Sequence, residues 1–322
     1  LERMKRHQIW YTASIVAWPD VPIEDLRETV RFADQHGARV IRVQLPGKTR
    51  FHPSTLAYNR TEVWERVVAT LRELRTEVAT PIYWQPYLYG SDPIEAEITG
   101  AIVGSPAALC GVRTGDVLLS VDGAPVRSRE EGRAMIYRAA EQGKPVDLRL
   151  GRSGQELSVT LDPDAEGQTY PYSAPGYDTS KLSLGVFMNQ GVHLPSVVDV
   201  LVSAHSRGRC RVLIITSELL QASVAKILDA ASSQMETAPS YDLIVPKATF
   251  FGGDIILGDL LVFSDIETAI TEHEAQHGFY DEIVLPATMA EAGADLTGVR
   301  FDTLNAAVGH RCRLAHHPRI LD

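Results

Sequence analysis

A short string of histidines around a glutamate offers the clearest chemistry in the sequence. His273, Glu274 and His277 form an HExxH pattern inside a stretch with helical patterning. Residues four apart share one face of a helix, so the two imidazoles could hold zinc while the glutamate acts as a general base. Glu291 is the candidate third ligand. Gly278 ends the predicted helix directly after the string, so we expect a solvated helix end without metal, with zinc binding as the alternative.

A second candidate site follows a predicted parallel strand at 241–245. Open α/β sheets bind ligands beyond the carboxyl ends of their strands, where glycines let a ligand approach the backbone and aromatic rings can stack on it. The candidate cofactor-binding residues are Lys247, Phe250, Phe251, Gly252 and Gly253. The alternative is that the two phenylalanines belong to a core. A further group of possible ligands, His310, Cys312, His316 and His317, lacks a recognised zinc spacing and is expected to be a polar C-terminal tail.

Composition excludes several function classes. The 322-residue chain is 44% hydrophobic and 22% charged, as ordinary soluble proteins are. Its net charge of −10 argues against nucleic-acid and anionic-membrane partners, which are met by basic patches. No apolar run approaches the roughly 20 residues of a membrane helix. The 3 cysteines are far apart and form no CxxC pair, so we expect a cytoplasmic protein without disulfides.

Strand-helix alternation dominates the first 92 residues. Apolar runs predict strands at 9–17, 40–45 and 82–89, with helical stripes between them. Such repeats predict a parallel sheet, but these strands are too few to close a TIM barrel. We expect either that they join the strands predicted after residue 182 in one sheet, or that another protein chain completes the barrel. That chain would be a different protein or a second copy.

The stretch 98–161 has a dense order of turn signals. Ser105-Pro106 leads to Gly115-Asp116, an alternating strand, the turn Asp122-Gly123 and a helix that starts at Ser128. This order resembles a PDZ domain of the bacterial type. The resemblance implies a groove that takes an extended peptide as an added strand and captures its carboxylate. No Gly-Leu-Gly-Phe-like loop precedes Ile98, where Glu95 and Glu97 stand instead. We therefore expect a packing or internal docking role, with capture of free C-termini as the alternative.

The sequence thus predicts an α/β protein with three parts. These are a partial TIM-barrel-like or open parallel α/β sheet, an inserted PDZ-like β-rich domain and a C-terminal α/β domain. The predicted boundaries are 1–92 for the barrel-like segment, 93–162 for the PDZ-like domain, 163–181 for a linker and 182–322 for the C-terminal domain.

A second resemblance concerns the C-terminal part. The phrases that carry it are residues 245–252, 258–261, 265–266 and 284–286. In this order they resemble the C-terminal domain of PDZ-containing radical S-adenosylmethionine (SAM) proteins, with Ala248 where that family has Asn. The CxxxCxxC loop that holds a [4Fe-4S] cluster is absent.

The second resemblance implies a subunit, fragment or partner-binding component of an oxidoreductase. Its cluster and SAM would be held by a partner chain or by a segment missing from this chain, which itself would bind no cofactor. The alternative is a zinc-dependent metallohydrolase that uses the helix of His273 and His277.

Overall fold

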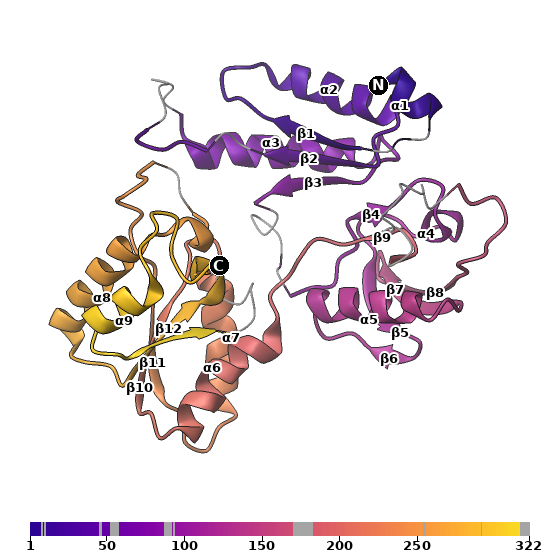
Figure 1. Cartoon of the computed structure of the whole chain (residues 1–322). Coiled ribbons are helices and arrows are strands. Elements are labelled where there is room, and N and C mark those ends of the chain that lie inside the picture. The colour runs from indigo at the N-terminus through magenta and orange to yellow at the C-terminus, as the bar shows by residue number, and fades with distance from the viewer. Residues whose placement is uncertain are drawn as a thin grey trace. The chain divides into compact units, whose positions relative to one another are not determined.

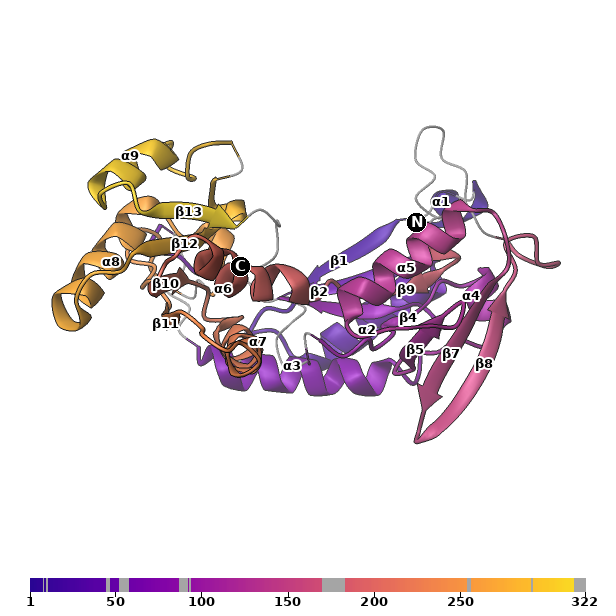
Figure 2. The same ribbon diagram turned by 90° about the horizontal axis from the view of Figure 1, so that it is seen from below.

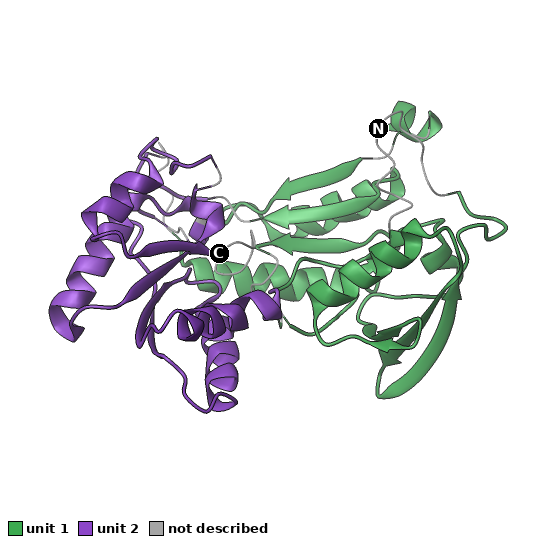
Figure 3. Cartoon of the chain, turned by 60° about the horizontal axis from the view of Figure 1, so that its bottom comes forward, with its two compact units in different colours: residues 1–46, 56–191 green, residues 47–55, 192–322 purple. Residues whose placement is uncertain are grey.

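A computed structural model gives the structure of the chain. It describes residues 1–7, 9, 11–44, 47–51, 58–86, 92, 94–169, 183–253, 256–290 and 292–315. The chain forms two compact units, one of residues 1–46 and 56–191 and one of residues 47–55 and 192–322 (Figure 3). Parallel and antiparallel sheets occur together with helices, which confirms the predicted mixed α/β fold.

The first unit begins with a parallel sheet of order β1-β2-β3 (Figure 1). Its elements are α1 (Glu2–Arg6), β1 (Thr12–Val16), α2 (Ile23–Gln35), β2 (Val40–Gln44), α3 (Arg60–Leu74) and β3 (Ile82–Gln85). Val30 of α2 and Leu71 of α3 are completely buried in one core with the strand residues Ile41 and Ile82. Asn59 caps α3, because its side-chain oxygen accepts hydrogen bonds from two backbone N–H groups of the first turn.

The predicted TIM-barrel character is not found in the described part of the chain. There β1, β2 and β3 form an open sheet of three strands, and no described strand of the second unit pairs with them. The alternative of one sheet shared with the later strands is therefore also absent among the described residues. Completion by another protein chain stays a prediction.

A β-rich domain makes up the rest of the first unit. Its elements are β4 (Gly100–Ala101), α4 (Pro106–Leu109), β5 (Val117–Val121), β6 (Ala124–Pro125), α5 (Arg129–Glu141), β7 (Val146–Arg152), β8 (Gln155–Leu161) and β9 (Val186–Phe187). The antiparallel sheet has the order β6-β5-β7-β8, and β4 pairs with β9. Asp116 of the predicted Gly-Asp turn is almost fully buried, and Arg152 of β7 neutralises it at 2.6 Å. This pair explains why the turn needs an aspartate.

The second unit is a parallel sheet of order β11-β10-β12-β13 with helices around it (Figure 2). Its strands are β10 (Arg211–Ile215), β11 (Ser240–Ile244), β12 (Glu282–Pro286) and β13 (Cys312–Ala315), and its helices are α6 (Leu194–Ser206), α7 (Gln221–Ser233), η2 (Gly258–Leu260), α8 (Phe263–His277), η3 (Ala287–Ala290) and α9 (Phe301–Ala307). All of β12 is buried, as expected for a central parallel strand. No helix in the described ranges is both long and apolar enough to cross a membrane.

Candidate functional site

Strand β9 has one edge that no strand in the described part of the chain covers. On the other edge, Ile102 N–H donates to the Gly185 carbonyl at 2.8 Å and Thr99 N–H donates to the Phe187 carbonyl at 2.9 Å. Because backbone groups alternate along an antiparallel strand, the N–H and C=O of Val186 point away from β4. No other strand of the described part pairs with β9. An unpaired edge of this kind is a template for one more strand.

The chain enters β9 through a tight turn that is fixed to α4. Leu184 and Gly185 both have positive φ, 49° and 85°. The Leu184 carbonyl accepts a hydrogen bond from Ala107 N–H at 3.0 Å. A Cβ on Gly185 would lie 1.9 Å from Ser105 Oγ, so only glycine fits there. Consecutive turn amides of this type form concavities that bind carboxylates.

Helix α5 runs beside β9. Leu184, Val186 and Met188 are buried in the same core as Ile136 and Ala139 of α5. Figures 1 and 2 both place β9 between β4 and α5. The strand continues along the helix, because the next segment is held to the start of α5 by a hydrogen bond from Gly191 N–H to Glu130 at 3.3 Å. A strand edge beside a helix is the arrangement in which PDZ domains take peptides.

The Gly-Leu-Gly-Phe-like loop that is missing ahead of Ile98 has a counterpart later in the sequence. The counterpart is the turn at Leu184 and Gly185 with β9, which follows the rest of the domain. The residues of this counterpart fall within 182–322, the range that the sequence predicts as the C-terminal domain. The structure pairs β9 with β4 and groups it with the first unit. The signal was the phrase Leu184-Gly185-Val186-Phe187, which has the apolar-Gly-apolar pattern expected of the missing loop. The acidic residues ahead of Ile98 are not at this turn: Glu97 lies 3.7 Å from Arg75 and bridges to Val117.

The predicted zinc ligands lie on α8 but are engaged with other side chains. His273 Nε2 lies 2.9 Å from the Tyr280 hydroxyl, which also bonds to Asp242 of β11. Burial and the bond to Asp242 raise the pKa of Tyr280 to about 12. The rings of His273 and His277 stack with their centroids 4.3 Å apart. The two imidazoles thus share a helix face, as predicted, and pack on each other.

Glu274, the predicted general base, is held by Arg311. Its Oε2 accepts a hydrogen bond from Arg311 Nη2 at 3.0 Å, and its side chain is only 10% exposed. Burial alone would raise the pKa of this carboxyl, but the bonds from Arg311 and from Tyr280 N–H lower it below its ordinary value. A carboxylate stabilised in its charged form is a weaker base.

The donor set does not fit a zinc ion in this arrangement. A catalytic zinc needs three converging protein ligands and an open position. Across the described ranges, no group of three His, Cys, Asp or Glu side chains is placed to hold a metal. The candidate third ligand Glu291 lies outside the described residues, as do His316 and His317. Cys312, expected in a polar tail, instead lies in β13, where burial raises the pKa of its thiol to about 12.

The glycine loop predicted to bind a cofactor packs against residues of its own unit. Arg50 N–H donates to the Phe251 carbonyl at 2.7 Å, and the Arg50 guanidinium lies over the Phe250 ring at 5.2 Å. A Cβ on Gly253 would lie 1.9 Å from the Lys48 carbonyl oxygen. The segment around Lys48 and Arg50 therefore occupies the space beside the glycines. A ligand at this loop would have to displace it.

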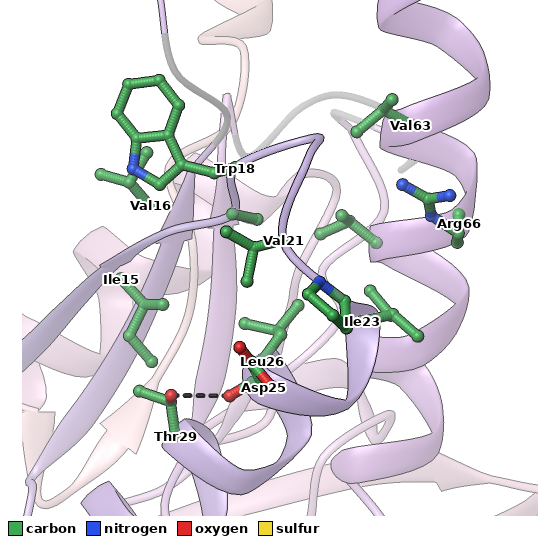
Figure 4. Close-up of a pocket in the computed structure, with 13 residues that line it drawn as sticks. Ile15, Val16, Trp18, Val21, Ile23, Asp25, Leu26, Thr29, Val63 and Arg66 are labelled. Atoms are coloured by element: carbon green, nitrogen blue, oxygen red, sulfur yellow. Dashed lines mark hydrogen bonds between the residues drawn. The ribbon is translucent and has the colours of Figure 1, made fainter.

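Two cavities in the first unit were not predicted. One of about 100 Å³ lies at the carboxyl end of β1, lined by Trp18, Val21 and Arg66 among others (Figure 4). It is smaller than the roughly 300 Å³ of typical ligand sites. The other, of about 400 Å³, has Asp34 and Thr169 in its lining. Asp34 is already engaged by Thr80 N–H at 2.9 Å.

Comparison with known proteins identifies one domain. The PDZ domain model matches residues 97–150. The chain is 44% identical over 64 residues to the magnetosome formation protease MamE of Paramagnetospirillum magneticum, which covers 20% of this chain and 9% of that protein. It is 24% identical over 179 residues to the metalloprotease MmpA of Caulobacter vibrioides, covering 50% of this chain and 44% of MmpA.

A third relative is mll0638 of Mesorhizobium japonicum, provisionally named a zinc metalloprotease. The identity is 24% over 200 residues, 53% of this chain and 52% of that protein. The chain thus spans about half or less of the length of these relatives.

These relatives overturn the radical SAM interpretation and the iron-sulfur partner that it implied. The phrases behind it have local explanations: Asp265 accepts hydrogen bonds from Phe250 N–H, and Val284 to Pro286 are part of the buried strand β12. Such features arise wherever a parallel sheet needs buried strands and fixed loops. What the comparisons establish is that the chain contains a PDZ domain.

Proposed function

We propose that this chain recognises peptides for a protease of the zinc-metalloprotease type, and that its PDZ domain binds an extended peptide along β9. The observation that carries the proposal is the unpaired edge of β9 beside α5, entered through the turn at Leu184 and Gly185. The relatives named as proteases supply the context. The peptide would be a protease substrate or a protein segment presented to one.

The chemistry of binding follows from the edge. The peptide backbone pairs with the N–H and C=O of Val186, and each such hydrogen bond contributes about 0.5–1.5 kcal/mol. The turn amides around Gly185 receive a carboxylate or a carbonyl at the peptide end. On α5, the half-buried Met135, which packs against the same core as Val186, favours an apolar peptide side chain. Main-chain pairing gives affinity and the apolar contact gives selectivity.

Fluorescence polarisation with labelled peptides tests the proposal on the intact chain. Candidate sequences come from a library with free or amidated C-termini. N-methylation is then scanned along the best peptide, which removes one backbone donor at a time without altering the protein. Pairing with one edge predicts that every second N-methyl group weakens binding by about tenfold, while the intervening ones have little effect. Binding that shows no such alternation, or a library without any ligand, would refute it.

Zinc-dependent peptide hydrolysis at α8 is a second candidate, which the names of the relatives and the HExxH string favour. It requires His273 to leave Tyr280 and Glu274 to leave Arg311. Metal analysis of the purified chain and of His273→Ala and Tyr280→Phe variants decides the matter. Stoichiometric zinc that is lost only in His273→Ala supports hydrolysis at α8. Absence of zinc from all three proteins, with peptide binding intact, leaves peptide recognition as the function.

A further inference from the structure

Three arginines surround one glutamate at the amino end of the sheet in the second unit. Glu282, the first residue of β12, is 6% exposed. Arg207 Nη2 donates to both of its oxygens, at 2.7 and 3.0 Å, and Arg313 Nε donates at 2.5 Å. Arg209 Nε stands farther off, at 4.0 Å. The carboxylate is thus fully used by two of the arginines.

The sequence places these arginines on both sides of β12. Arg207 and Arg209 directly precede β10, and Arg313 lies in β13, and these two strands flank β12 in the sheet. Helix α6 ends at Ser206, and a helix C-terminus favours nearby cations. Local structure therefore accounts for Arg207. It does not account for the other two charges.

The cluster has more positive charge than its acids neutralise. Besides Glu282, the cluster includes Asp281, whose Oδ2 accepts hydrogen bonds from the backbone N–H groups of Cys210 and Arg211 at 2.8 and 2.9 Å. Those bonds, together with the charges of Arg209 and Arg211, lower the pKa of Asp281, so it is ionised at neutral pH. Arg209 has no ion-pair partner closer than 4.0 Å among the described residues. The three arginines therefore exceed Glu282 and Asp281 by one positive charge.

A buried donor in the cluster also lacks an acceptor. Arg313 Nη2 is inaccessible to solvent and has no hydrogen-bond partner in the described part of the chain. Leaving a buried charged donor unsatisfied is costly, and native structures rarely do so without a reason. The side chains of Arg207, Arg209 and Arg313 are 39%, 48% and 23% exposed, so an ion from solvent can reach all three side chains although Arg313 Nη2 itself is covered. Surplus charge, an unsatisfied donor and access from solvent together indicate an anion site.

We propose that Arg207, Arg209 and Arg313 bind a doubly charged oxyanion of the phosphate class, as free phosphate or as the phosphate group of a small metabolite. Guanidinium forks match the oxygens of phosphate in pairs, and several such forks favour a dianion over a single carboxylate. The site is independent of peptide binding, because it lies in the second unit and uses none of the PDZ residues.

Titration of the intact chain with inorganic phosphate tests the site, at constant ionic strength and with succinate and chloride as comparison anions. We expect saturable binding of phosphate by calorimetry and a rise in the melting temperature of the second unit. The Arg209→Ala variant should bind phosphate about tenfold more weakly, because it loses one charged hydrogen bond to the anion. It should keep its fold, because Arg209 is half exposed and only loosely paired.

Arg300→Ala is the matched control. It removes the same charge from the same unit at a residue that is 71% exposed and paired only with Asp302 at 3.7 Å. Phosphate affinity unchanged in Arg300→Ala and lowered in Arg209→Ala supports the site, and Arg209→Lys, which keeps the charge but loses the fork, should be intermediate. Equal effects of the two alanine variants, no saturable phosphate binding, or tighter binding of succinate than of phosphate would each overturn the assignment.

Discussion

Substitution of Gly185 by alanine tests whether β9 belongs to the PDZ domain. A non-glycine residue at φ 85° costs about 1–2 kcal/mol. The new Cβ would lie 1.9 Å from Ser105 Oγ and 2.1 Å from Ser105 Cβ, which real structures do not tolerate. Relief of such an overlap by backbone shifts costs about 1–3 kcal/mol more. We therefore expect Gly185→Ala to destabilise the first unit by about 2–5 kcal/mol.

Gly154→Ala is the matched control. Gly154 has φ 80°, and a Cβ there would meet no atom within 4 Å, so this variant carries the backbone cost alone. Ser105→Gly in the Gly185→Ala background removes the clashing side chain. Ser105 caps α4 by accepting from Ala108 N–H, but glycine in place of a serine cap costs only a few tenths of a kcal/mol. The double variant should therefore regain most of the difference between the two alanine variants.

Hydrogen exchange with mass spectrometry is the appropriate assay. A chain with two units need not unfold in one step, so a single global midpoint is not well defined. Exchange in peptides that cover Ile98 to Ser105 reports the opening free energy of the β4–β9 pair itself. Equal protection in Gly185→Ala and Gly154→Ala, or no rescue by Ser105→Gly, would show that β9 is not packed on α4.

Three further predictions concern the carboxylates Glu274 and Asp242 and the cap of α5. Glu274→Gln breaks the ion pair with Arg311 and should destabilise the second unit by about 3 kcal/mol in calorimetry; a loss below about 1 kcal/mol would contradict it. Because Asp242 and Glu274 have lowered pKa values in the folded state, their contribution is complete above the ordinary carboxyl value of about 4 and is lost as the pH falls through the folded values. Urea midpoints of the second unit should therefore fall steadily below about pH 4, and a midpoint that rises on acidification would refute this. Ser128→Ala removes the cap of α5, which accepts from Glu131 N–H at 3.3 Å, and should cost about 1 kcal/mol by exchange in α5, whereas Ser128→Gly should cost only a few tenths.

Local signals explain what the sequence could predict. In the PDZ domain, Asp122 and Gly123 have positive φ at the turn between β5 and β6, as an Asp-Gly pair indicates. Ser128 caps α5 where a serine before a helical stripe predicts a cap. Each of these features is decided within a few residues. For the same reason α8 ends at His277, directly before Gly278, as the sequence predicts.

Long-range pairing explains what the sequence could not predict. Strand β9 follows β4 at a distance of more than 80 residues, and a two-residue ladder leaves no periodic pattern that names its partner. The HExxH string has the same limitation. Its spacing fixes the helix face, but whether His273 meets a metal or Tyr280, and whether Glu274 meets a water or Arg311, depends on residues from other elements.

The relatives can be compared with two features of the structure. These are the edge of β9 in the PDZ domain and the α8 network, in which His273 contacts Tyr280 and Glu274 contacts Arg311. The match to MamE spans 64 residues, close to the 54 residues of the PDZ model match, 97–150, and it has the highest identity of the three. A match of this length has the size of one PDZ domain. The α8 residues that a hydrolase would need are instead committed to Tyr280 and Arg311. The proposed peptide recognition rests on the edge of β9 that no described strand covers, and hydrolysis at α8 requires that this network first be broken.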